Sequence, residues 1–404
     1  MGRTANGKAP LFYRHLFAAP VTPKGLTARR LLGVEMSGIR KMFELAGKDA
    51  VNMGLGEPDF EPAPHIAEAL REAVATGKNH YGPTLGLPQL REAIAHRIKD
   101  YRGENVSAEN IIVTAGATQA LMTLNHTFVD HGDEVLYPDP GFVLYPSQAR
   151  ICGGFPIPYS LTAENKYQPD VDEIQAKITP RTKLVMVNTP SNPTGACMDK
   201  ETVRAICEIA EDKGVMIVAD EVYDFLSYDA PHQSFLSHMD NVIWVNSFSK
   251  TYALTGWRLG CIATKKEYVK AIETMHYYTV ACPPTPFQWA GVAALEGPQD
   301  QAEEMLVTFR KRRDRVAGRI RKIRGLHMVK PGGAFYAFPR YDFDIPSQEL
   351  ALDLAKEGLI GVPGSAFGHL GEGHLRFSYA TSLEKIDAGM DILEAYCNEL
   401  PLKD

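Results

Sequence analysis

Between about residues 105 and 265, short apolar runs alternate with longer stretches in which apolar residues recur at helical spacing. The runs lie at 111–114, 134–137, 183–188, 215–219, 242–246 and 259–263. Short continuous apolar runs predict strands that are buried on both faces. The stretches between them predict helices, such as one from Asp199 to Lys213 that ends at Gly214. Strands alternating with helices predict an α/β domain with a mainly parallel sheet.

The pattern changes after Gly297. A long, highly charged helix is expected over about 301–323, a second helix over 347–357 and a strand over 375–379. These elements predict a smaller α+β domain. We therefore expect an N-terminal arm and part of the small domain at 1–50, a large domain at 51–297, and the small C-terminal domain at 298–404.

Composition narrows the possible functions. The chain has 45% hydrophobic and 23% charged residues, which is typical of a globular protein. Its net charge of -6 argues against nucleic-acid binding, which favours a basic surface. Neither a signal peptide nor an apolar run of about 18 residues is visible, so we expect a cytoplasmic protein without a membrane span. The six scattered cysteines form no C-x-x-C pair and predict neither disulfides nor a metal site.

One basic run could suggest an anion site. Residues 310–313 read Arg-Lys-Arg-Arg, with acidic residues close by at Glu303, Glu304 and Asp314. The simplest interpretation is a solvated face of the long charged helix, because neighbouring charges of both signs are typical of exposed helices.

Polar residues follow several of the predicted strands, where ligands bind in parallel sheets. After the strand at 111–114, Gly116, Ala117 and Thr118 open a helix, whose N-terminal N–H groups could bind a phosphate. A turn of this kind is also common without any ligand. Phe142, after the next strand, could stack on a planar ring. The alternative is an ordinary core phenylalanine.

Two further strand ends carry an amide and a carboxylate. Asn192 lies in a turn rich in proline, where its amide could meet a ligand oxygen. Asp220 closes the strand at 215–219, and a carboxylate there is costly unless it is paired or reached by solvent. It could keep a pyridine nitrogen protonated, which would turn the ring into an electron sink. A structural role as a helix N-cap is the alternative.

The most informative segment is Ser247-Phe248-Ser249-Lys250, with Arg258 eight residues further on. A lysine at the end of an apolar strand has a lowered pKa if it is desolvated, and its neutral amine is then a nucleophile. Ser247 and Arg258 are suitable donors to a phosphate. Far downstream, Arg376 lies within an apolar run and needs an anion. That anion could be a substrate carboxylate or a structural salt-bridge partner.

Taken together, these residues resemble the class I aminotransferases of fold type I, which use pyridoxal 5'-phosphate. The resemblance runs over nearly the whole chain from Ser37. It includes further motifs at 54–60, 80–82, 90–91, 332–335 and 362–368, and the segment 278–289 is most similar to archaeal-type aromatic and aspartate aminotransferases. It implies a large domain with a seven-stranded, mainly parallel sheet flanked by helices, joined to the smaller α+β domain.

The resemblance also implies a role for each site residue. Three residues would be catalytic: Lys250 as the imine-forming amine and proton shuttle, Asp220 on the ring nitrogen, and Tyr223. The remaining cofactor contacts would come from Gly116, Ala117, Thr118, Phe142, Asn192, Ser247 and Arg258. Arg376, Gly56 and Asn192 would bind the substrate carboxylate. Tyr81 would reach the phosphate of a second subunit, which implies a homodimer with shared active sites.

The implied function is transfer of an α-amino group to a 2-oxo acid by a ping-pong mechanism that alternates the pyridoxal and pyridoxamine forms. Aromatic or aspartate substrates are expected, although Thr118 stands where one acidic-substrate branch has a lysine. That difference puts strict aspartate specificity in doubt. Residues 1–35 have no counterpart and no assigned function.

Other functions remain to be weighed against this one. A lyase performing β- or γ-elimination with the same cofactor is the main alternative, because it would need the same cofactor residues. A sensor domain of a transcription regulator is disfavoured, because the N-terminal extension is too short for a DNA-binding domain and the chain is not basic. A nicotinamide dehydrogenase is disfavoured because no G-x-G-x-x-G motif follows a strand.

Overall fold

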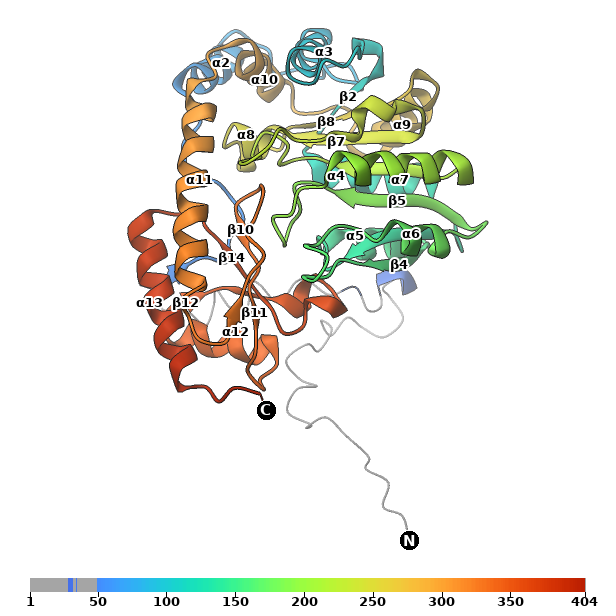
Figure 1. Ribbon diagram of the computed structural model, residues 1–404. Helices are drawn as coiled ribbons and strands as arrows, with labels where there is room; N and C mark the ends of the chain where they lie inside the picture. The colour runs from blue at the N-terminus through green and yellow to red at the C-terminus, as the bar shows by residue number, and fades with distance from the viewer. Residues whose placement is uncertain (1–27, 32–33, 35–48, 404) are drawn as a thin grey trace.

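A seven-stranded sheet forms the centre of the computed structural model, which describes residues 28–31, 34 and 49–403 (Figure 1). Its strands, in spatial order, are β2 (Ile111–Thr114), β8 (Gly260–Ala263), β7 (Val242–Ser247), β6 (Met216–Asp220), β5 (Thr182–Asn188), β3 (Glu134–Asp139) and β4 (Phe155–Ser160). Only β8 runs antiparallel to its neighbours in this sheet. The predicted mainly parallel α/β sheet is therefore confirmed.

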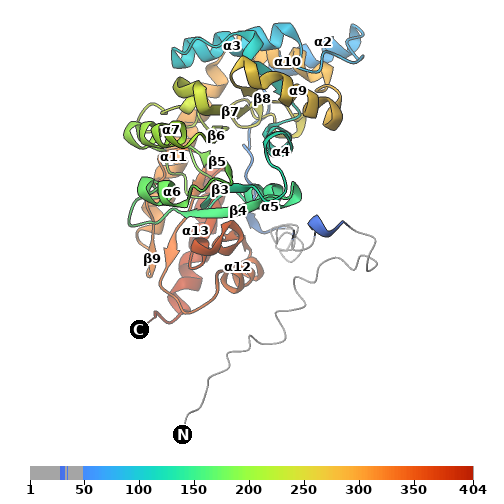
Figure 2. The ribbon, with the colours of Figure 1, turned by 90° about the vertical axis from the view of Figure 1, so that its right-hand side faces the viewer.

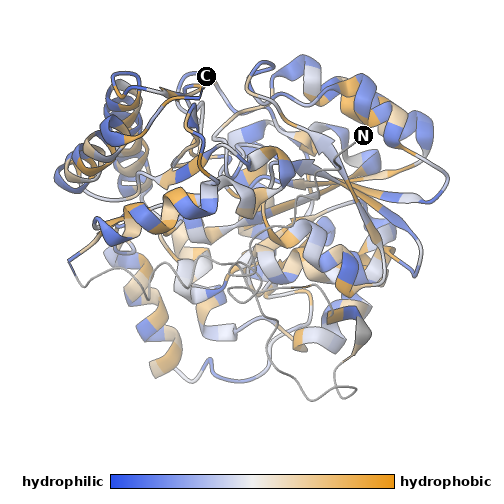
Figure 3. Ribbon diagram, turned by 90° about the horizontal axis from the view of Figure 1, so that it is seen from below, coloured by the Kyte–Doolittle hydropathy of each residue, from blue (hydrophilic) through white to orange (hydrophobic). Residues whose placement is uncertain are grey.

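Helices cover both faces of the sheet, as Figure 2 shows. One face packs against α4 (Ala117–Phe128), α5 (Leu144–Ile151) and α9 (Lys266–Val280), and the other against α6 (Val171–Lys177) and α7 (Lys200–Lys213). The strands are mainly hydrophobic in Figure 3, whereas the helices carry both hydrophobic and hydrophilic residues. Burial on two faces explains why the strands read as continuous apolar runs.

The seventh strand, β4, has no such signal in the sequence. It is an edge strand that pairs only with β3, and its residues are mostly exposed or half-buried. It also contains Pro156 and Pro158, which lack the N–H groups that a central strand would need. Its sequence therefore has neither the apolar run nor the residue types that predict a strand.

A third group of helices covers the β2 and β8 end of the sheet. It consists of α2 (Pro64–Ala75), α3 (Pro88–Arg102) and α10 (Thr285–Glu296), which pack against each other. The one-turn helix α8 (Phe248–Thr251) follows β7 directly and contributes Phe248 to the same core.

The C-terminal part of the chain is the predicted smaller α+β region. Its helices are α11 (Asp300–Ile320), α12 (Ser347–Lys356) and α13 (Leu383–Glu399). Its short strands form three small sheets. One pairs β9 (Leu326–His327) with β11 (Arg340–Tyr341), and another pairs β12 (Leu359–Ile360) with β1 (Val51–Asn52). The third has three strands, in the order β10 (Tyr336–Ala337), β14 (Leu375–Ser378) and β13 (Val362–Pro363). Because β1 pairs with β12, the chain just before Met53 lies with the C-terminal part.

The prediction of a solvated basic face on the long charged helix was wrong for two residues of α11. Arg312 and Arg313 are 7% and 1% exposed. The Arg312 guanidinium binds both carboxylate oxygens of Asp59, at 2.6 and 2.9 Å, and Arg313 pairs with Asp229 at 2.5 Å. Both partners lie far away in sequence, so the local charge pattern could not reveal them. These ion pairs connect α11 to the segments that contain Asp59 and Asp229.

The expected N-terminal arm before residue 50, including Ser37, lies almost entirely outside the described residues. In the described part of the chain, no helix combines the length and hydropathy needed to cross a membrane. The same residues contain no cluster of three or more His, Cys, Asp or Glu side chains that could hold a metal ion.

Candidate active site

A cavity of about 270 Å³ opens at the carboxyl ends of the central strands. Asn188 ends β5, Asp220 ends β6 and Ser247 ends β7, and all three line it. The cavity brings together most of the predicted site residues, namely Gly56, Ala117, Thr118, Phe142, Asn192, Asp220, Tyr223, Ser247, Lys250, Arg258 and Arg376. These residues come from segments that are up to 320 positions apart in the sequence.

Lys250 projects into this cavity from α8, the single turn that Ser247 caps by accepting a hydrogen bond from the Ser249 N–H at 3.1 Å. Its Nζ donates to the carbonyl oxygen of Gly56 at 2.6 Å. Burial lowers the pKa of Lys250 to about 8, with Glu57 opposing the change and the cationic Arg376 and Arg258 adding to it. A substantial fraction of the amine is therefore neutral near neutral pH, as a nucleophile requires.

Asp220 is 3% exposed, and its Oδ2 accepts a hydrogen bond from the Tyr145 hydroxyl at 2.8 Å. Burial raises the pKa of Asp220 to about 6, although the bond from Tyr145 acts in the opposite direction. The carboxylate is ionised at neutral pH but poorly compensated. It would stabilise a cation placed beside it in the cavity.

An anion cradle lies at the start of α4. Gly116 is the N-cap residue with φ +81°, and a Cβ there would come within 2.5 Å of the Arg258 guanidinium. Glycine is therefore required both for the backbone conformation and for the approach of Arg258. Ala117 and Thr118 form the first turn, where N–H groups have no partner within the helix and attract anions. The Ser247 side chain lines the same cavity.

Arg376 lies on β14 and is held in a fixed orientation. Its guanidinium lies 4.5 Å from the ring centre of Tyr336 and 4.8 Å from that of Phe367. Nη1 donates to Oδ1 of Asn192 at 3.0 Å, and Nη2 donates to the Gly54 carbonyl at 2.6 Å. Burial lowers the pKa of Arg376, but a guanidinium stays charged. Its Nε is buried without a hydrogen-bond partner. Nη1 and Nη2 each donate one of these bonds and keep a second N–H, so donors remain for an incoming carboxylate.

Tyr145 and Tyr336 are among the lining residues that were not predicted from the sequence. Tyr145 lies one helical turn beyond Phe142 and supplies the bond to Asp220, so helical spacing from Phe142 was the available signal. Tyr336 follows the Gly332–Phe335 motif, and its hydroxyl is 2.8 Å from that of Tyr223. A Cβ on Gly56 would collide with the Tyr336 hydroxyl, which explains the glycine there.

Two predicted residues do not line the cavity. Gly116 lies directly before the lining residues Ala117 and Thr118, where it makes room for Arg258. Tyr81 is 92% exposed and does not line the cavity of its own chain. Its implied role concerned a second subunit, so that role stays a prediction.

Comparison with known proteins identifies the family of this chain. Residues 48–393 match the family model for aminotransferase class I and II. The chain belongs to this aminotransferase family. A probable aspartate aminotransferase of Methanocaldococcus jannaschii is 41% identical over 91% of this chain and 99% of its own length. Aromatic-amino-acid aminotransferase 2 of Thermococcus litoralis is 38% identical over 92% and 98%.

Solved structures agree with this assignment. An alanine aminotransferase from Pyrococcus furiosus superposes with a TM-score of 0.88 at 36% identity, over 92% of this chain and all of that one. An aromatic aminotransferase from Pyrococcus horikoshii gives a TM-score of 0.84 at 38% identity, over 89% and 99% of the two chains. The protein is therefore an aminotransferase, and the lyase alternative is not favoured.

Aminotransferases of this family use pyridoxal 5'-phosphate, and the cavity fits that cofactor. It offers a buried amine on Lys250, a poorly compensated carboxylate on Asp220, and an anion cradle where the absence of a Cβ on Gly116 leaves room for the Arg258 guanidinium. When bound, the cofactor supplies a carbon that forms an imine and a protonated ring that withdraws electrons. The three features match its aldehyde, ring nitrogen and phosphate.

Asp220→Asn should stabilise the cofactor-free aminotransferase at neutral pH. Because burial raises the pKa of Asp220 from 3.8 to about 6, the wild-type protein loses stability as the pH rises from about 4 through 6. Above that range the variant should be more stable by about 3 kcal/mol, since one pKa unit corresponds to about 1.4 kcal/mol. Urea unfolding of both cofactor-free proteins between pH 4 and 8 would measure the difference.

The same variant should bind the cofactor more weakly, because a carboxylate that would stabilise the protonated ring is lost. Tyr145→Phe is a matched control that removes the hydrogen bond but keeps the carboxylate. A stability difference between wild type and Asp220→Asn that does not change with pH would contradict the assignment of a raised pKa to Asp220.

Proposed function

We propose that this aminotransferase moves the α-amino group of an amino acid to a 2-oxo acid by a ping-pong mechanism, with Lys250, Asp220 and Tyr223 as its catalytic residues. One observation carries the proposal. An amine, a carboxylate and a carboxylate-binding guanidinium, from Lys250, Asp220 and Arg376, line a single cavity at the carboxyl edge of the sheet.

Arg376 and Asn192 bind and orient the substrate. The guanidinium keeps one N–H on each of Nη1 and Nη2 for the α-carboxylate, and its bond to Asn192 fixes its orientation. A carboxylate anchored at this point brings the substrate Cα towards Lys250. There Lys250 Nζ would take the α-proton of the substrate and later give it back, which is general acid–base catalysis by one positioned amine.

The other residues hold the cofactor in position. Asp220 pairs with the ring nitrogen, and Phe142 packs on the ring. Tyr223 and Asn192 bind the phenolic oxygen. The phosphate is bound by the turn at 116–118 together with Ser247 and Arg258. The proposal gains support from Gly116, whose missing Cβ leaves room for Arg258.

We extend the proposal to the assembly and the location of the protein. Tyr81 is exposed and does not contribute to its own cavity, so it is free to contact the phosphate bound in a second subunit. That contact would make the enzyme a homodimer with shared active sites, acting in the cytoplasm. The domain division at about residues 51 and 298 belongs to the same proposal.

For substrates, we propose aromatic amino acids or aspartate, with 2-oxo acids as acceptors. Relatives are named for aspartate, for aromatic amino acids and for alanine. Leu55, Leu121 and Phe142 give the cavity apolar walls. Among the described lining residues, the cations are Lys250, Arg258 and Arg376, and each already has a role. This favours aromatic side chains over aspartate.

Single half-reactions test the proposal directly. The holoenzyme is mixed with each amino acid of a panel without any 2-oxo acid, and the loss of its imine absorbance is followed. Conversion in one turnover, reversed by a 2-oxo acid, is expected, and kcat/KM ranks the substrates. Continuous release of ammonia without an acceptor would instead indicate elimination and overturn the proposal. A higher kcat/KM for aspartate than for phenylalanine would overturn the aromatic preference.

A further inference from the structure

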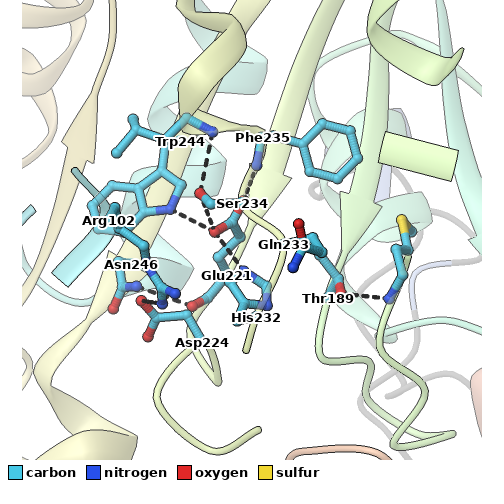
Figure 4. A network of polar contacts seen from close by, with 12 residues as sticks. Arg102, Thr189, Glu221, Asp224, His232, Gln233, Ser234, Phe235, Trp244 and Asn246 are labelled. Carbon is cyan, nitrogen blue, oxygen red and sulfur yellow. Dashed lines mark hydrogen bonds and ion pairs between the residues drawn. The ribbon is translucent and has the colours of Figure 1, made fainter. Parts of the chain in front are cut away.

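Next to Asp220 lies a second carboxylate that does not line the cavity. Glu221 is fully buried, and four donors surround its side chain (Figure 4). Its Oε2 is bound by His232 Nε2 at 2.8 Å, Ser234 Oγ at 2.7 Å and Trp244 Nε1 at 3.0 Å, and its Oε1 by the Phe235 N–H at 2.8 Å. Burying a carboxylate costs free energy because the group loses its hydration. The four hydrogen-bond donors compensate for that loss.

The donors come from two different parts of the chain. His232, Ser234 and Phe235 lie at the end of the loop that begins at Glu221. Their hydrogen bonds to the Glu221 carboxylate therefore hold the two ends of this loop together. Trp244 lies on β7, the neighbouring strand. The side chain of Glu221 therefore joins the loop to β7.

The backbone of Glu221 makes a second connection to the same strand. Its N–H donates to the Val245 carbonyl at 2.9 Å, and its carbonyl accepts from Asn246 Nδ2 at 3.0 Å. The other side-chain atom of Asn246, Oδ1, accepts from the Ser247 N–H at 2.6 Å. Glu221 is thus linked through one amide to the residue that leads into α8 and Lys250.

Both connected segments carry cofactor-site residues. The loop carries Tyr223, whose hydroxyl meets that of Tyr336, and β7 ends at Ser247. We infer that Glu221 is a positioning residue, which fixes Asp220 and Tyr223 relative to Ser247 and Lys250 without touching the cofactor itself. This inference rests on the cofactor contacts given under the proposed function.

The histidine in this network binds the Glu221 carboxylate through Nε2. His232 has a 1% exposed side chain, and its Nδ1 is buried without a partner. Because a carboxylate only accepts hydrogen bonds, the hydrogen of this bond lies on Nε2. An amide in place of the carboxylate would turn an NH₂ group towards one or more of these donors.

The test compares two buried glutamates of the same sheet. Glu134 opens β3, away from the cavity, and accepts hydrogen bonds from Thr179, Thr182 and Arg181. Glu221→Gln and Glu134→Gln therefore make the same change to a similarly bonded carboxylate. We expect both to lower the Tm, whereas only Glu221→Gln raises the Kd for pyridoxal 5'-phosphate, by about 10- to 100-fold, as expected for one or two lost bonds to a charged acceptor.

The Kd is measured by titrating the cofactor-free proteins well below their unfolding temperatures, and near-UV circular dichroism reports the orientation of the bound ring. Equal Kd values for Glu221→Gln and wild type, or an equal increase in both variants, would overturn the inference. If Glu221→Gln does not fold, Ser234→Ala and Thr179→Val remove one hydroxyl donor from each glutamate. Only the former should raise the Kd.

Failure of the proposed function would look different. In that case the wild-type protein itself would form no imine band that depends on Lys250. If the wild type forms this band and Glu221→Gln binds the cofactor equally well, only the role of Glu221 is refuted.

Discussion

Lys250→Ala is expected to lower the rate of amino-group transfer by at least about 10⁴-fold, because it removes both the nucleophile and the base that moves the substrate proton. The cavity provides no substitute among its described residues, since Arg258 and Arg376 are the other cations there and guanidinium groups do not act as bases at neutral pH. Single-turnover kinetics with a saturating amino acid would measure the loss.

Two controls separate chemistry from charge. Lys250→Arg keeps a positive charge near the Gly56 carbonyl but provides no neutral amine, so it should be as inactive as the alanine variant. A small primary amine added to Lys250→Ala should restore part of the rate, because it can enter the space left by the side chain. Turnover at a wild-type rate in either variant would refute the assignment of Lys250.

Arg376→Ala is expected to lower kcat/KM for amino acids by about 10²- to 10³-fold, mainly through KM. The guanidinium is buried and contacts the rings of Tyr336 and Phe367. Nη1 and Nη2 each keep one N–H, so a substrate carboxylate would bind to a fixed fork. Truncating one partner of a buried, hydrogen-bonded charge pair costs about 2–5 kcal/mol. Steady-state kinetics with both substrates would test this.

The matched control for Arg376 is a change in the substrate. A primary amine without an α-carboxylate cannot use the guanidinium, so wild type and Arg376→Ala should convert it at similar rates. Arg376→Lys should recover only part of the loss with amino acids, because an ammonium lacks the planar fork. An equal loss for the amine and the amino acid would show that Arg376 supports the fold and does not bind the carboxylate.

The sequence predicted the elements whose signals are local. Strands β5, β6 and β7 are buried on both faces and therefore read as apolar runs, and their polar end residues pointed to the cavity. Lys250 and Asp220 were informative because a charged residue beside a buried strand is costly unless it is paired or has a function. Gly116 gave a weaker signal, because a glycine that follows a strand and opens a helix could let an anion approach the helix N-terminus but is also common without a ligand.

Other features depend on partners that are distant in the sequence. Arg313 was predicted to be solvated, but it pairs with Asp229, which lies 84 positions away. Strand β4 was not predicted, because it is an edge strand with one neighbour, β3, and lacks an apolar run. Glu221 could be seen next to Asp220, but its four donors come from a returning loop and from another strand. The role of such a residue follows from its tertiary contacts and not from its type.

The two edges of the central sheet have a practical consequence for handling the enzyme at high concentration. On β4, two prolines remove backbone donors, and Lys177 and Glu173 of α6 bind the Pro158 carbonyl and the Ser160 N–H. On β2, the Val113 N–H is bound by the Leu85 carbonyl, and Arg91 binds the Ile111 carbonyl. Open strand edges are templates for aggregation, and here several of their hydrogen-bonding groups are already occupied. At high protein concentration, the central sheets of different molecules should therefore not pair along these edges to form fibrils.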